Sequence, residues 1–315
     1  MAQKTSGKIA PHKKSLLARI WQARIAYLLL APLLIGLIVT AYYPPISGLY
    51  HSLFDWNANG REVFIGLDNF KELFQDPVFL NSIPTLFKLM IPRLLISVIV
   101  PLIAAELIFG VRSKRWQYNY RVMVLLPMVA PGLVYTLLWQ KIYDPQSGLL
   151  STILRGLGLI GQDQIVNWLG DPKLVIPALI FMGFPWIGGT AVLIYMSGLM
   201  NISGEVIEAS ILDGCTPMQR IRHIDLPLLM ATACIMLILR AGNLMNVGFE
   251  KVFLMQNDLN MSTSEIIATY VYKMGLRNSQ YAVSTAVNLF NNLINFGLLL
   301  LVNCITRKLG ETSLW

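Results

Sequence analysis

Apolar residues along this chain gather into windows about as long as a membrane is thick. The hydrocarbon core of a bilayer measures about 30 Å, and a helix needs about 20 predominantly apolar residues to cross it. Windows of this kind recur along the chain, with polar connections between them. The pattern predicts six membrane-spanning helices, at Ile25 to Tyr43, Leu86 to Phe109, Val122 to Trp139, Leu174 to Met200, Leu228 to Val247 and Ala282 to Ile305.

The windows differ in the polar and helix-breaking residues that interrupt them. The first, fourth and sixth hold no charged residue. The third is broken by Pro127, Pro131 and Gly132, which a spanning helix tolerates where its neighbours satisfy the freed backbone groups. In the second, we expect Arg93 and Glu106 to lie near the ends of the span, where long side chains can reach the interface.

Composition agrees with an integral membrane protein. Hydrophobic residues make up 55% of the 315 residues and charged residues only 13%, against about 25% charged residues in soluble domains. No connection is long enough to be a separate domain, so residues 25–305 are predicted to form one unit between a basic N-terminus (1–24) and a tail (306–315). The predicted fold is an all-α membrane protein with six transmembrane helices.

Lysine and arginine are distributed unevenly among the connections. Residues 1–24 hold six basic residues and no acid, and residues 110–121 hold four and no acid. Residues 44–85 hold two basic and five acidic residues. Because positive residues accumulate on the cytoplasmic side, both termini are predicted to be cytoplasmic. Basic residues gathered in the predicted cytoplasmic segments account for the net charge of +8, so this charge does not indicate a nucleic-acid partner.

No residues have the spacing of a catalytic or metal site. Gly156, Gly158 and Gly161 match a dinucleotide-binding spacing, but no strand is expected before them and they fall in an outer connection. The three histidines are far apart, and the three cysteines have no metal-ligand spacing. A phosphate-binding loop of the form G-x-x-x-x-G-K-[ST] is missing as well. The sequence therefore predicts neither an enzyme nor a metal site.

The inner connection, residues 201–227, is predicted to be structured and charged. Ser203 is expected to cap a short helix with Glu205 in its first turn, where the helix dipole favours an anion. Gly214 is expected to end this helix in the left-handed conformation.

A second short helix should follow at once. Thr216 and Gln219 have the spacing of a capping box, with Pro217 at the first helical position. Pro227 is expected to end this helix ahead of the fifth span. Two such helices with exposed apolar residues need either a partner surface or, as the alternative, a place among lipid headgroups.

The connection holds Glu208-Ala209, then Gly214, and then Ile224-x-Leu226-Pro227, with nine residues between the glycine and the isoleucine. This pattern resembles the EAA loop of permease subunits from binding-protein-dependent ABC importers. Asp213 before the glycine and Arg220 after it are similar to the carbohydrate-importer version of the loop. The departures from the pattern are Ser210, Cys215, Met218 and Ile221. The matching residues are Glu208, Ala209, Asp213, Gly214, Arg220, Ile224, Leu226 and Pro227.

The resemblance extends over nearly the whole chain. Residues 64–70 and the pair Trp168-Leu169 look like further family signatures. Residues 248–253 and 311–315 are similar to permeases that import oligosaccharides, of the lipoprotein-associated and alginate types.

The resemblance implies a type I ABC importer architecture with a cytoplasmic EAA coupling loop, in a bacterial cytoplasmic (inner) membrane. The implied partners are a second homologous permease, two ATP-binding subunits that use ATP and Mg, and an extracytoplasmic solute-binding protein that delivers an oligosaccharide. The loop of such importers docks into a cleft on an ATPase subunit. Glu208 would meet a basic group there, Gly214 would form the bend, and Pro227 the rigid junction to span five. The chain itself would bind no cofactor.

Polar and aromatic residues inside the spans are candidate contacts for a solute. A charge near the bilayer centre costs about 2.5 to 3.5 kcal/mol on insertion scales, so Arg240 is expected to face protein or a water-filled cavity. Amides could match sugar hydroxyls, or simply hydrogen-bond neighbouring helices at about 0.6 to 2 kcal/mol each. The candidates are Arg240, Asn243 and Asn246 in span five, Asn288, Asn291, Asn292 and Asn295 in span six, and the aromatic residues Trp139, Trp186, Tyr195 and Tyr135.

An ion-coupled secondary transporter that works without an ATPase is the alternative function. Such a protein would need acidic residues inside the membrane for a proton or sodium relay, and Glu106 is the one candidate. A membrane-bound enzyme is not supported, because no nucleophile, base or metal ligands can be placed together on one side of the membrane.

Overall fold

A computed structural model describes residues 21–184, 188–242 and 248–308. The described chain is mostly helical, which confirms the all-α fold, and its strands are a small antiparallel pair, β1 (Phe54–Trp56) and β2 (Glu62–Phe64). The chain divides into a unit that ends at His51 and a unit that begins at Ser52. Most of the basic N-terminus, the tail residues 311–315 that resemble oligosaccharide permeases, and residues 185–187 and 243–247 lie outside the described residues.

The first unit is one helical stretch made of α2 (Arg24–Leu37), η1 (Ile38–Tyr42) and α3 (Tyr43–His51). Its 28 residues are apolar enough to span a membrane, and none of its side chains is buried within the chain. The helix continues through Pro44 and Pro45, beyond the predicted end of the first span at Tyr43. The π-helical segment η1 ends at Tyr42, two residues before Pro44, and its wider turn accommodates residues without a backbone N–H donor.

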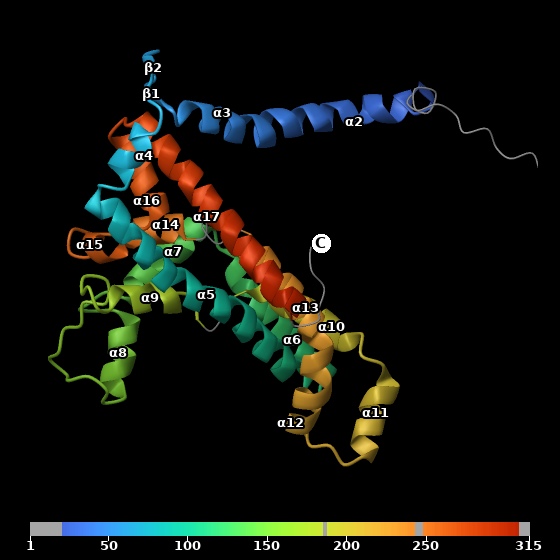
Figure 1. The fold of residues 1–315 in the computed structure, drawn as a ribbon. Helices are drawn as coiled ribbons and strands as arrows, with labels where there is room; N and C mark the ends of the chain where they lie inside the picture. The colour runs from blue at the N-terminus through green and yellow to red at the C-terminus, as the bar shows by residue number, and fades with distance from the viewer. Residues whose placement is uncertain (1–20, 185–187, 243–247, 309–315) are drawn as a thin grey trace, which may run out of the picture. The chain divides into compact units, whose positions relative to one another are not determined.

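The second unit contains all the remaining elements (Figure 1). Its helices are, in chain order, α4 (Asp68–Leu73), α5 (Pro77–Phe109), α6 (Lys114–Leu125), η2 (Leu126–Val129), α7 (Gly132–Ile142), α8 (Leu149–Gly156), α9 (Val175–Phe181), α10 (Gly189–Met200), α11 (Gly204–Leu212), α12 (Pro217–Arg220), η3 (Ile221–Asp225), α13 (Leu226–Ala241), α14 (Phe249–Met255), α15 (Met261–Ser264), α16 (Ile267–Tyr272), η5 (Lys273–Arg277) and α17 (Tyr281–Lys308).

Four helical stretches of the described chain are long and apolar enough to cross a membrane. They cover residues 24–51, 77–109, 217–241 and 281–308. Two bent helix pairs pass the same test of length and composition, so the number rises to as many as six if each pair is one span: α6 and η2 with α7, bent by 96°, and α10 with α11, bent by 73°. The first bend falls at the prolines that interrupt the predicted window 122–139.

The predicted window 174–200 is two helices where we expected one continuous span. α9 ends at Phe181 and α10 begins at Gly189. Gly188, which precedes α10, has a φ of +85°, and a Cβ at this position would lie 3.0 Å from Pro101 of α5. Only glycine combines that backbone conformation with so little space. The start of α10 is therefore held closely against α5.

α5 is the central helix of the unit and begins nine residues before the predicted window. Asp76 caps it by accepting a hydrogen bond from the backbone N–H of Val78 at 2.7 Å, and Pro77 occupies the first turn. The hydroxyl of Tyr270 donates to the second oxygen of Asp76 at 2.6 Å. Burial, and then this carboxylate, raise the pKa of Tyr270 above its ordinary value. The start of α5 is thus tied to α16.

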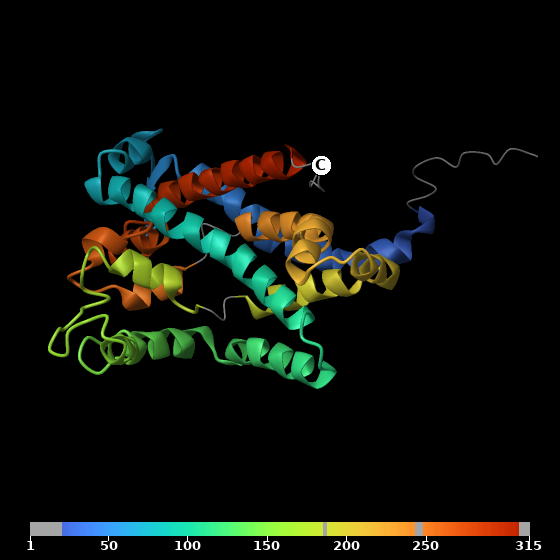
Figure 2. The same cartoon turned by 90° about the horizontal axis from the view of Figure 1, so that it is seen from below.

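α5 crosses the unit with α6 and α7 along one flank and α17 on the other (Figure 2). It packs against α9, α10, α13 and α16. Its first half, with Phe79 and Leu86, belongs to one buried apolar cluster, and its last turns, with Ala105, belong to a second cluster around Tyr195 of α10. Because lipid is as apolar as these side chains, close packing and hydrogen bonds hold such helices together.

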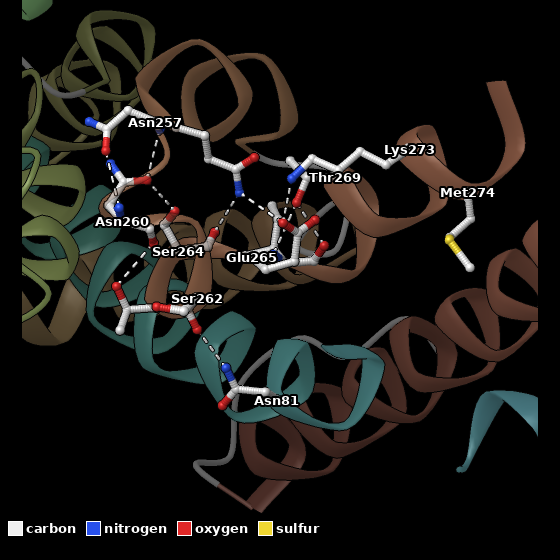
Figure 3. A network of polar contacts seen from close by, with 12 residues as sticks. Asn81, Asn257, Asn260, Ser262, Ser264, Glu265, Thr269, Lys273 and Met274 are labelled. Atoms are coloured by element: carbon white, nitrogen blue, oxygen red, sulfur yellow. Dashed lines mark hydrogen bonds and ion pairs between the residues drawn. The ribbon is translucent and has the colours of Figure 1, made fainter. Parts of the chain in front are cut away.

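A buried polar network joins α14, α15 and α16 (Figure 3). The amide of Asn260 donates to the backbone carbonyls of Leu169 at 2.6 Å and Met255 at 2.9 Å, and its oxygen accepts from Ser264 at 3.0 Å. Lys273 pairs with the buried Glu265 at 2.5 Å. The network replaces apolar packing where three short helices meet.

Replacing Asn260 by alanine is expected to lower the free energy of unfolding by about 2 to 4 kcal/mol, since it leaves buried carbonyl groups without donors. Asn81→Ala is the matched control, because the exposed Asn81 makes one bond, to the carbonyl of Ser262 at 2.7 Å (Figure 3). That loss should stay below about 1 kcal/mol. Unfolding titrations in mixed micelles measure both, and equal losses would contradict the importance of the buried network.

Candidate functional site

The charged connection at residues 201–227 folds into two short helices, as its cap residues predict. Ser203 holds the N-cap position of α11, although its side chain makes no capping bond. Gly214 follows α11 with a φ of +74°, the left-handed conformation that favours glycine. Thr216 and Gln219 form the predicted capping box of α12, with the Thr216 N–H donating to Gln219 Oε1 at 2.8 Å.

The two helices project from the second unit at the end opposite to β1, α4 and α16 (Figure 1). Glu208 and Asp213 are exposed on α11 and at its C-terminus. Large apolar side chains are exposed beside them: Ile211 is 65% exposed, Leu212 88% and Met218 72%. Apolar side chains gathered with charges on a projecting surface are typical of a docking site for another protein.

The junction to the fifth span differs from the expectation that Pro227 ends the second helix. α12, η3 and α13 form one helical stretch of 25 residues from Pro217 to Ala241. The π-helical η3 ends at Asp225, two residues before Pro227, which lies in the first turn of α13. Here too the wider turn accommodates the missing N–H of a proline. A rigid helix therefore connects α12 to the core of the unit.

A buried group of charges holds the base of this helix against α5. Asp225 is completely buried, and its Oδ2 accepts a hydrogen bond from Nε of Arg220 at 2.9 Å. The Arg220 guanidinium also lies over the Phe109 ring, 5.6 Å from its centre. Glu106 of α5 is 7% exposed and interacts electrostatically with Asp225 and Arg220. We expected Glu106 to reach the membrane interface, but it is buried at this junction.

A cavity of about 340 Å³ lies between α5, α7, α13 and α14. Its wall is apolar at Leu89, Met90 and Leu94 of α5, and three cations, Arg93, Arg240 and Lys251, line it together with Tyr135. Arg93 donates to the backbone carbonyl of Leu179 at 2.9 Å. Lys251 lies over the ring of Tyr135, with Nζ 5.6 Å from the ring centre.

Arg93 and Lys251 are the cavity residues that sequence reasoning missed. Arg93 was expected near the end of its span, but α5 begins at Pro77, so Arg93 lies at the midpoint of the helix. The adjacent Asp76-Pro77, a helix-start signal, could have revealed this. Lys251 lies in α14, beyond the predicted end of span five, and no local pattern connects it with α5.

Among the predicted pathway residues that the structure describes, Arg240 and Tyr135 line the cavity, and the others lie in different parts of the unit. Asn295 donates to the carbonyl of Gly242 at 2.9 Å and so joins α17 to α13. Asn291 is buried, whereas Asn288 and Asn292 are exposed on α17. Asn243, Asn246 and Trp186 lie outside the described residues.

The two remaining aromatic candidates pack within the protein. Tyr195 is completely buried in the second apolar cluster, because α10 lies tightly between α5 and α13. Trp139 is half-buried against the first cluster, with its ring 5.4 Å from that of Tyr143. In residues 21–184, 188–242 and 248–308, no group of three or more His, Cys, Asp or Glu could hold a metal ion.

Comparison with known proteins matches residues 79–310 to the family described as "Binding-protein-dependent transport system inner membrane component". Protein LplB of Bacillus subtilis (strain 168) is 28% identical, covering 96% of this chain and 94% of that protein. The polygalacturonan/rhamnogalacturonan transport system permease protein YteP of the same organism is 26% identical with the same coverage. A chain of a bacterial alginate ABC transporter, solved in complex with an alginate pentasaccharide-bound periplasmic protein, is 27% identical with a TM-score of 0.84, covering 95% of this chain and 99% of that one.

Proposed function

Since this chain belongs to the family of binding-protein-dependent transport system inner membrane components, we propose that it forms the membrane path for an oligosaccharide in an ATP-driven importer. The chain is a permease subunit and not an enzyme. The observation that carries the substrate class is the fold shared over nearly the whole length with a permease of the alginate transporter. The polysaccharide named for YteP supports the same class.

The complex we propose contains three further kinds of component. A solute-binding protein delivers the oligosaccharide, as the complex with a periplasmic protein in the alginate transporter suggests. A second, homologous permease completes the path, and two ATP-binding subunits hydrolyse ATP with Mg in the cytoplasm. The basic residues of 1–24 and 110–121 support a topology with both termini in the cytoplasm of a bacterium.

The loop helices are proposed to couple ATP hydrolysis to movement of the spans. Glu208 is exposed on α11, where it can pair with a basic group on an ATPase subunit. Gly214 forms the bend, and α12, η3 and α13 act as one lever. The buried pair of Arg220 and Asp225, beside Glu106 of α5, supports a rigid connection from the loop to the central helix. Such rigid-body movement is a common way to change access to a site.

The remaining residues of the EAA pattern fit this lever in position. Ala209 is exposed on α11 between Glu208 and the buried Ser210, where a small residue leaves room for a close partner surface. Ile224, Leu226 and Pro227 lie in η3 and the first turn of α13, at the base of the lever. We propose that they keep α12 aligned with α13 during the movement.

The solute path is proposed to pass through the cavity that Arg240 and Tyr135 line. Asn288 and Asn292, exposed on α17, are proposed to face either the solute or the second permease. The roles of Asn243, Asn246 and Trp186 stay predictions from the sequence. We propose a packing role, in the helices that surround the path, for Asn291, Asn295, Trp139 and Tyr195.

Reconstitution in proteoliposomes tests the proposed function. The complete complex, with its ATPase and solute-binding protein, should accumulate a labelled oligosaccharide only when ATP and Mg are on the ATPase side. Removal of the solute-binding protein should reduce uptake to background. Uptake driven by a proton or sodium gradient without ATP would instead establish a secondary transporter and overturn the proposal.

A further inference from the structure

Three positive side chains from three helices meet in the cavity. Arg93 comes from the midpoint of α5, Arg240 from the last turn of α13 and Lys251 from the first turn of α14. They are separated in sequence by up to 158 positions (251 − 93), so the fold and not a local motif brings them together. Positive charges inside a spanning region are costly and are typical of a binding function.

These cations form no ion pair in the part of the chain that the structure describes, although Glu250 lies close enough to interact with the charge of Lys251. None of the three has a carboxylate oxygen within 4.0 Å there. Glu250 is the acid next to the cavity, but its side chain is exposed and its oxygen lies 3.3 Å from where a Cβ of Gly132 would be. The group formed by these four side chains keeps an excess of positive charge.

The contacts that the cations do make leave them free to bind an anion. The bond from Arg93 to the carbonyl of Leu179 uses one of the five N–H donors of a guanidinium. Lys251 lies over the Tyr135 ring, which attracts a cation without neutralising it. The apolar wall of Leu89, Met90 and Leu94 lowers the local dielectric constant and so strengthens attraction to an incoming negative charge.

From this geometry we propose that the cavity binds an acidic oligosaccharide, with the carboxylates of uronate units pairing with Arg93, Arg240 and Lys251. The proposal rests on the proposed function, because it names the substrate class of the same path. The planar guanidinium groups match a carboxylate in a bidentate manner, and the compact ammonium adds a third charge. The ring of Tyr135 offers an apolar face for a sugar ring beside Lys251.

The test compares two sugars of equal length in the reconstituted complex: an oligogalacturonate, and the neutral oligosaccharide obtained by reducing its carboxyl groups. Uptake of each is divided by the measured occupancy of the solute-binding protein, so that selection by that protein is removed. The unaltered complex should transport the acidic sugar faster. Arg93→Gln, Arg240→Gln and Lys251→Gln should each lower transport of the acidic sugar about tenfold, and leave the neutral sugar within about twofold of its original rate.

Two further variants separate charge recognition from general damage. Lys88→Gln removes one positive charge from the exposed side of α5, away from the cavity, and should change neither rate. Arg93→Lys keeps the positive charge and should retain the preference for the acidic sugar. The inference is overturned if the glutamine variants slow both sugars equally, or if Lys88→Gln acts as they do.

The two proposals fail in different ways. If the unaltered complex takes up no saccharide with ATP, the proposed function itself is wrong. If it takes up both sugars with ATP at equal normalised rates, it is an importer of oligosaccharides whose cavity does not select for charge, and only this inference fails.

Discussion

Glu208→Lys is expected to lower ATP-dependent uptake by at least about tenfold, because like charges placed together at an interface cost several kcal/mol. Glu208 is exposed on α11 at the projecting end of the second unit (Figure 1). It makes no hydrogen bond or ion pair within the described chain that its loss would disturb. The variant should therefore insert into the membrane normally and fail only in contact with the ATPase.

Glu205→Lys is the matched control for this change. Glu205 is also exposed on α11, one turn earlier, where its charge interacts with the helix dipole. Its replacement should cost about 0.3 to 1 kcal/mol of helix stability and leave most of the uptake. Uptake and substrate-stimulated ATP hydrolysis are measured on complexes purified in equal yield. Full substrate-stimulated hydrolysis with Glu208→Lys would remove Glu208 from the coupling surface.

Arg220→Met is expected to lower the free energy of unfolding by about 3 to 5 kcal/mol, because it leaves a buried carboxylate without its cation. Asp225 is completely buried, and the nearby Glu106 adds a second buried acid. Methionine keeps much of the length and packing of the arginine stem, so the loss reports charge and not volume.

Lys71→Met supplies the comparison, since it breaks an ion pair between Lys71 and Asp68 that is 71% and 61% exposed. Exposed pairs contribute about 0 to 1 kcal/mol, so this variant should unfold almost as the original does. Combining Arg220→Met with Asp225→Asn removes the unpaired charge and should restore at least half of the loss. Titration with denaturing detergent in mixed micelles measures all three. Equal midpoints for Arg220→Met and Lys71→Met would show that the buried pair does not stabilise the junction.

Local features of the site could be predicted because they depend on residues close together in the sequence. The capping box of Thr216 and Gln219 and the left-handed Gly214 follow from side-chain chemistry within a single turn. The number of apolar windows likewise follows from the thickness of a bilayer.

The contacts between helices could not be predicted in the same way. Apolar windows show that a segment spans the membrane but leave open which face meets which neighbour, since nearly every face is apolar. The meeting of Arg93 with Arg240 and Lys251, and of Glu106 with Arg220, depends on that choice. Tyr195 was expected to be free to touch a solute, but the close approach of α10 to α5 buries it.

The π-helical η3 sets the rotation of the following helix, α13, about its own axis. A π turn holds one residue more than the α turn it replaces, and each residue rotates a helix by about 100°. Deleting one residue between Ile221 and Asp225 would therefore rotate α13 relative to α12. Arg240, on α13, would then point about a quarter of a turn away from its present direction. Insertions and deletions here should be far rarer among homologues than substitutions.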